Sequence, residues 1–138
     1  MSPDTYHEWL TVADERRDDA LKLQQERPQS IASVYLADYA IECTLKALLH
    51  KQGRSFLRSG RGGHNLRQLW ADCGFRVSDL QDPKGTQTFY LQTWDTSLRY
   101  ESKLPSEPGL ETEALIQGAK RICGLVRTEI RRHGSRKR

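Results

Sequence analysis

Apolar positions recur at steps of three and four along most of this chain, which is the period of an α-helix. The first run places Tyr6, Trp9, Ala13, Arg16, Ala20 and Leu23 on one helical face. Ser2 or Asp4 can cap its beginning, and Pro28 cannot continue it. We therefore predict a first helix over about residues 4–27.

The second run begins after Ser30, a good N-cap residue, and ends at Gly53. Its apolar residues lie nearly all round the helix: Ile31, Val34, Tyr35, Leu36, Ile41, Leu45, Leu48 and Leu49. A helix that is apolar on every side is buried among other helices. We therefore expect this second helix at the centre of a bundle.

Three more helices are predicted after it. A short one, which Asn65 can cap, ends at the Cys73-Gly74 pair. A longer one is marked by Leu91, Trp94 and Leu98 and reaches Arg99 and Tyr100 before two prolines. The last helix carries apolar residues on one face: Leu115, Ala119, Ile122, Val126 and Ile130. Because no segment alternates with period two, we predict an all-α, up-and-down bundle of four long helices and one short helix. It forms a single domain over residues 1–133, followed by a basic tail at 134–138.

The net charge of +4 is distributed unevenly. Residues 51–67 carry +5 and no acid, residues 127–138 carry +5, and the rest of the chain carries −6. Basic groups confined to one loop and one tail are typical of a surface that contacts a polyanion. Two solvated basic segments without a partner are the alternative.

The three cysteines Cys43, Cys73 and Cys123 form no CxxC pair and have no histidine at metal-ligand spacing. We expect buried thiols, no disulfide, no metal and no cofactor, in a cytoplasmic protein. The opening SPDTYHEWL has no apolar core of a secretion signal. The longest apolar stretch, residues 31–49, contains three charged residues, so no membrane span is predicted.

Four features of the sequence belong together: a W-x3-A-x6-A first helix (Trp9, Ala13, Ala20), a second helix reading YLADYAIECTLKALLH, the HNLRQL start of the short helix (His64, Leu66, Leu69), and the pair Arg99-Tyr100. In combination they resemble the HEPN family, small helical domains named for nucleotide binding in higher eukaryotes and prokaryotes. Their order spans most of the chain. The resemblance implies a compact helical bundle that is often dimeric.

The resemblance also implies a cellular setting, because HEPN members often accompany nucleotidyltransferases or act in toxin-antitoxin and phage-defence systems. We accordingly expect a homodimer with a protein partner such as a nucleotidyltransferase or an antitoxin. Some members are metal-independent ribonucleases that use an arginine and, after four to six residues, a histidine from both subunits. In that chemistry the histidine is the general acid and base, and the arginine stabilises charge on the phosphate.

Two arginine-histidine pairs in this chain have the ribonuclease spacing, Arg58 with His64 and Arg127 with His133. A chain this rich in arginine produces such spacings by chance. A glycine-rich loop and a helix end also hold catalytic geometry poorly. Arg99, which is better placed, has no histidine at this spacing. We therefore do not expect catalysis, with His64 and Arg99 as the candidates if it occurs.

RNA or a nucleotide is expected to bind through the basic loop and an arginine-histidine cluster. The predicted contact residues are Arg54, Arg58, Arg61, His64, Arg99 and Tyr100. Three charged residues of the second helix lie four apart on one face: Asp38, Glu42 and Lys46. We expect them to line a groove opposite the Arg99-Tyr100 pair. The alternative is a solvated or interhelical salt-bridged stripe. A noncatalytic protein-interaction subunit and a metal-independent endoribonuclease remain open as other functions.

Overall fold

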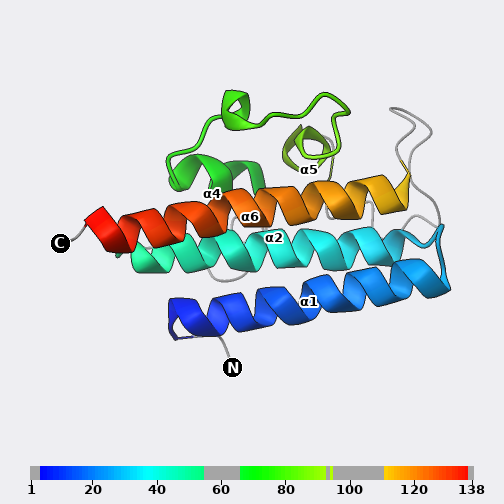
Figure 1. Ribbon diagram of the computed structural model, residues 1–138, viewed down its shortest axis with the longest axis horizontal. Helices are drawn as coiled ribbons and strands as arrows, with labels where there is room; N and C mark the ends of the chain where they lie inside the picture. The colour runs from blue at the N-terminus through cyan, green and yellow to red at the C-terminus, as the bar shows by residue number, and fades with distance from the viewer. Residues whose placement is uncertain (1–3, 55–65, 93, 95–110, 137–138) are drawn as a thin grey trace.

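The computed structural model of the protein describes residues 4–54, 66–92, 94 and 111–136, and these residues form helices and loops without a strand. The elements are α1 (Tyr6–Glu26), α2 (Ile31–Lys51), α4 (Leu66–Asp72), the 3-10 helix η1 (Val77–Asp79), α5 (Thr88–Gln92) and α6 (Thr112–Arg136). The all-α prediction is confirmed for this part of the chain. The helices α1, α2 and α6 lie side by side along the longest axis, with α4, η1 and α5 in a layer above α6 and α2 (Figure 1).

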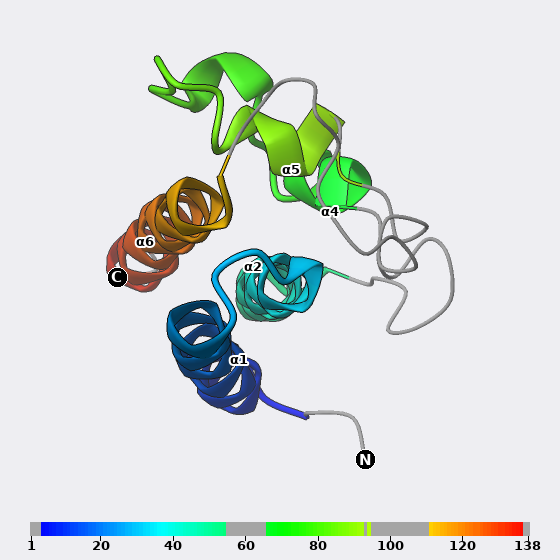
Figure 2. The ribbon, with the colours of Figure 1, turned by 90° about the vertical axis from the view of Figure 1, so that its right-hand side faces the viewer.

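The central helix is α2, which packs against α1, α4 and α6. Viewed from one end of the bundle, α2 lies between α1 on one side and α4 with α5 on the other, and α6 lies beside α2 between these two groups (Figure 2). Val34, Ile41, Leu45 and Leu48 of α2 are fully buried. The expectation that this helix lies at the centre of the bundle is therefore confirmed.

The beginning of α1 differs from the prediction, because Thr5 is the N-cap. The Thr5 hydroxyl accepts a hydrogen bond from the Glu8 backbone N–H at 3.1 Å, and the Glu8 carboxylate accepts one from the Asp4 N–H at 3.2 Å. The sequence Thr5-x-x-Glu8 is close to a capping box, in which a residue three positions after the cap returns a hydrogen bond. Ser2 lies outside the described residues, and Asp4 is wrong as the cap because Thr5 takes that position.

Both ends of α2 follow the prediction. The Ser30 hydroxyl accepts from the Ala32 N–H at 3.2 Å, and Gly53 has a φ of 73° just beyond the last turn. The Gly53 N–H donates to the His50 carbonyl, and the next N–H, of Arg54, donates to the Leu49 carbonyl, each at 3.0 Å. This is the Schellman arrangement, which needs a left-handed residue and so favours glycine.

The second layer is held to α6 by a close backbone crossing. At Gly118 a side-chain carbon would come within 2.8 Å of three Thr86 atoms, two of them in the backbone. Nearby, the Tyr90 hydroxyl donates to the Leu115 carbonyl at 2.9 Å, and Tyr90 is almost completely buried. These contacts fix the position of α5 on the N-terminal half of α6.

The helix that the sequence predicts through Tyr100 is described only in part. The helix α5 contains five residues, and Trp94, which follows it, is not helical. Trp94 is partly buried against the core, with its ring centroid 6.0 Å from that of Phe89. The remaining residues of this expected helix, 93 and 95–100, lie outside the described part of the chain.

Candidate nucleic-acid interface

The helices α2 and α6 run in the same direction and finish at the same end of the bundle, where α1 begins (Figure 1). We call this the basic end and define it by the described residues Lys51, Arg54, Arg131 and Arg132. Lys51 and Arg54 come from the first basic segment of the sequence, and Arg131 and Arg132 come from the second. Tertiary structure therefore brings together two charge clusters that are about 80 residues apart in the chain.

The two residues from the first segment make specific contacts. The Lys51 ammonium lies 3.3 Å from the Tyr6 hydroxyl oxygen and 4.5 Å from the centroid of the same ring. The exposed Arg54 donates from Nη1 to the Asp72 carbonyl at the end of α4. Arg54 thus connects the start of the basic loop to the second layer. It is the one predicted binding residue that the described part of the chain contains.

Two other arginines of these segments have structural roles. Arg67 donates from Nε to the Leu91 carbonyl at 2.9 Å and so caps the end of α5. Arg127 donates from Nη2 to an Asp14 carboxylate oxygen, which joins α6 to α1. Arg127 is therefore committed to an interhelical ion pair, and this occupation weakens the Arg127-His133 pair as a catalytic candidate.

The other predicted contact residues, Arg58, Arg61, His64, Arg99 and Tyr100, lie outside the described residues. Asn65, the expected cap of α4, lies outside as well. Their roles stay predictions.

Lys46 and Glu42 form a buried ion pair on α2. Nζ of Lys46 lies 2.9 Å from Oε2 of Glu42, and both residues are less than 5% exposed. The Lys46 ammonium also lies 5.3 Å from the Trp9 ring centroid, at the packed surface between α2 and α1. The alternative of a solvated stripe is wrong, because tertiary packing covers this face. The groove expectation stays a prediction, since Arg99 and Tyr100, the residues expected opposite it, are not described.

Asp38, one turn earlier on α2, is buried without such a partner. Its Oδ1 has no hydrogen-bond partner in the part of the chain that the structure describes. Desolvation, followed by the negative charge of Glu42, raises the pKa of Asp38 well above its ordinary value, while the Trp94 indole lowers it less. The carboxyl group is therefore held in its neutral form well above the pH at which a solvated aspartate ionises.

The cysteines are free and buried, as expected. Burial raises the pKa of Cys43 and that of Cys73 to about 12 and also raises the pKa of Cys123. Thiols with such values are poor nucleophiles at neutral pH. Among the described residues, no group of three or more histidine, cysteine or acidic side chains is placed to hold a metal ion.

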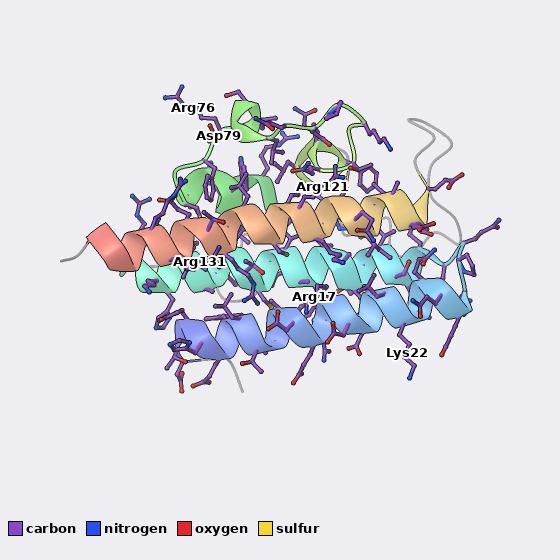
Figure 3. All side chains as sticks on the ribbon, viewed as in Figure 1. Arg17, Lys22, Arg76, Asp79, Arg121 and Arg131 are labelled. Atoms are coloured by element: carbon purple, nitrogen blue, oxygen red, sulfur yellow. The ribbon has the colours of Figure 1, made fainter. Side chains whose placement is uncertain are left out.

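A hollow of about 480 Å³ lies beside α6, and the sequence analysis missed it. One wall is the C-terminal half of α6, with Leu125, Thr128, Glu129 and Arg132; the other runs from the end of α4 to η1, with Cys73, Gly74, Phe75 and Asp79. The signal in the sequence is the i, i+3, i+4, i+7 spacing of the α6 residues, which places them on one stripe beside the core-facing stripe. Figure 3 shows Asp79 and Arg76 on the side of α6 away from α1, and Arg131 on the side toward α1.

Local chemistry shapes the second wall. Gly74 has a φ of 93° and ends α4 in a second Schellman arrangement, in which the Phe75 N–H donates to the Trp70 carbonyl at 3.2 Å. The reversal stacks the Phe75 ring on the Trp70 ring, with centroids 4.3 Å apart. Asp79 in turn accepts from the Arg76 N–H at 2.7 Å. These contacts set the positions of Phe75 and Asp79 at the hollow.

No helix in the described part of the chain combines the length and the apolar character needed to cross a bilayer. Comparison with models of protein families, with curated proteins and with solved structures finds no match to this chain. The resemblance to the HEPN family therefore stays a prediction from the residues that carry it.

Proposed function

We propose that this protein is a HEPN-type helical module that binds single-stranded RNA through the basic end of its bundle. The observation that supports the proposal is the common end of α2 and α6, where Lys51 and Arg54 of one basic segment lie at the same end as Arg131 and Arg132 of the other. The chain outside the two basic segments carries a net charge of −6. Single-stranded nucleic acid is bound mainly by basic surfaces that follow its backbone. A setting in a toxin-antitoxin or phage-defence system follows from the family resemblance.

The proposal assigns contacts to both segments. The basic loop that starts at Arg54 supplies Arg58, Arg61 and His64, and α6 supplies Arg131 and Arg132. Arg54, at the start of this loop, donates to the Asp72 carbonyl and so joins the end of α2 to the end of α4. Charges from two parts of the chain then act on one phosphate backbone.

The test measures the affinity of a labelled RNA oligonucleotide over a range of salt concentrations. Each phosphate contact of a single strand contributes a slope of about −0.7 to the logarithm of the binding constant against the logarithm of salt. We expect Arg61→Gln and Arg131→Gln each to weaken binding and to make this slope shallower by about 0.7. The matched control is Lys22→Gln, because Lys22 is exposed near the other end of α1 and points away from the bundle (Figure 3).

Two results would reject the proposal. One is the absence of RNA binding at low salt, and the other is binding whose affinity does not change with salt. An effect of Arg61→Gln without one of Arg131→Gln would reject the shared basic end and leave the loop as the contact surface.

A further inference from the structure

The hollow beside α6 combines two kinds of wall. Phe75 and Leu125 supply apolar surface, and one face of the Phe75 ring already stacks on Trp70. Asp79 of η1 and Glu129 of α6 bring a carboxylate from each wall, and Thr128 adds a hydroxyl group. Volumes of about 300–1,000 Å³ with apolar walls and a few polar groups are typical of small-molecule sites. At about 480 Å³, the hollow has room for one planar heterocycle with its sugar.

The polar groups select among planar ligands. An ionised carboxylate only accepts hydrogen bonds and offers two oxygen atoms for doing so. Its best partner is a ring edge with two adjacent N–H donors. Guanine has this edge in its N1–H and 2-amino groups, whereas the pairing edges of adenine, cytosine and uracil each place an acceptor beside a donor. Unpaired bases are commonly read through that edge while they lie against an aromatic ring.

A phosphate group has its own partner at the hollow. Arg132 lies one turn beyond Glu129 on α6 and is exposed, and a guanidinium group binds phosphate with paired hydrogen bonds. The Asp72 carbonyl that accepts from Arg54 directly precedes Cys73, the first residue of the other wall. Arg132 thus belongs both to the lining of the hollow and to the basic end.

We propose that this hollow binds the base of a guanine nucleotide, with the carboxylates of Glu129 and Asp79 on its N1–H and 2-amino groups, Phe75 along the ring, and Arg132 on the phosphate. This site rests on the proposed function, because it makes the hollow the base-reading part of the RNA surface. The nucleotide is either a free monophosphate or an unpaired guanosine of the RNA, and the two share the same chemistry.

The direct test is calorimetric titration of the full chain with guanosine 5′-monophosphate and adenosine 5′-monophosphate. A good bidentate contact to a base distinguishes it from a wrong base by roughly tenfold or more, so we expect guanosine monophosphate to bind about tenfold more tightly. Tryptophan fluorescence gives a second signal, because Trp70 stacks on the ring that lines the hollow. Equal affinities for the two nucleotides would overturn the proposal.

Variants test the two halves of the site separately. Glu129→Gln replaces one acceptor oxygen with a donor, so the ratio of the affinities for guanosine and adenosine monophosphate should fall close to one. The control Glu113→Gln, on the exposed first turn of α6, should leave this ratio unchanged. Arg132→Gln should weaken the binding of guanosine monophosphate about tenfold and leave the binding of guanosine, which has no phosphate, unchanged. The control for charge is Arg121→Gln, at an exposed site on the other half of α6 (Figure 3).

The outcomes separate this proposal from the proposed function. Salt-dependent RNA binding together with equal binding of the two nucleotides would overturn the guanine site alone. A guanine preference that survives Glu129→Gln would overturn the assigned contacts, provided that circular dichroism shows the variant to be folded. Competition with guanosine monophosphate by a guanosine-containing RNA, and not by oligoadenylate, would support RNA as the source of the base. A guanine preference without such competition would support the free nucleotide.

Discussion

Replacing Gly118 with alanine tests the close crossing between α6 and the loop that precedes α5. The added carbon would lie 2.8 Å from the carbonyl carbon, the carbonyl oxygen and Oγ1 of Thr86, about 0.6 Å inside ordinary van der Waals contact. Because two of these atoms belong to the backbone, no change of rotamer relieves the clash. The helix or the loop must shift, and overpacking of this kind costs about 1–3 kcal/mol.

The same substitution at Gly124 supplies the matched control. Gly124 is exposed on the same helix, and a carbon built there meets nothing within 4 Å. Alanine in place of glycine inside a helix otherwise stabilises it by about 0.5–1 kcal/mol. This gain is common to both sites, so the difference between the two variants isolates the overpacking term of about 1–3 kcal/mol.

The assay is urea unfolding followed by circular dichroism, with the free energy of unfolding compared between the variants. We expect Gly124→Ala to be more stable than the parent and Gly118→Ala to be less stable. Adding Thr86→Ala to Gly118→Ala should restore only part of the loss, because Oγ1 is one of three clashing atoms. If Gly118→Ala is as stable as Gly124→Ala, α6 does not lie this close to Thr86, and the reasoning is refuted.

Two further predictions concern the buried charges of α2. Asp38→Asn should raise the free energy of unfolding relative to the parent, by an amount that grows with pH above about 4. The reason is that the Asp38 carboxyl of the unfolded parent ionises above this pH, whereas burial keeps the carboxyl of the folded parent neutral. Urea titrations from pH 4.5 to 8 check this, and a difference between the two proteins that stays constant with pH would contradict it. Lys46→Ala should lower the free energy of unfolding by about 3–5 kcal/mol, because it removes the cation that pairs with the buried Glu42 carboxylate. The double variant Lys46→Met with Glu42→Leu should recover most of this loss. Equal losses in the single and double variants would show that the ion pair is not the cause.

The local sequence pattern was sufficient to predict helix ends whose capping signals lie within a few residues of them. Ser30 and Gly53 mark the ends of α2 because a hydroxyl cap and a left-handed glycine act on the turn next to them. The apolar residues nearly all round α2 likewise predict its central place. The start of α1 was misplaced, although the Thr5-x-x-Glu8 signal was present, because Ser2 and Asp4 are equally good caps by residue type.

The sequence by itself determined an all-helical chain with a central α2 and two basic segments. Only the tertiary structure decided that the residues of the basic end lie together, that Arg127 is held by Asp14, and that the charged stripe of α2 is buried. It alone also placed the α6 stripe of Glu129 opposite Phe75. The physical reason is that helix periodicity and caps depend on neighbours within about one turn, whereas burial, ion pairs and hollows depend on which distant faces pack together.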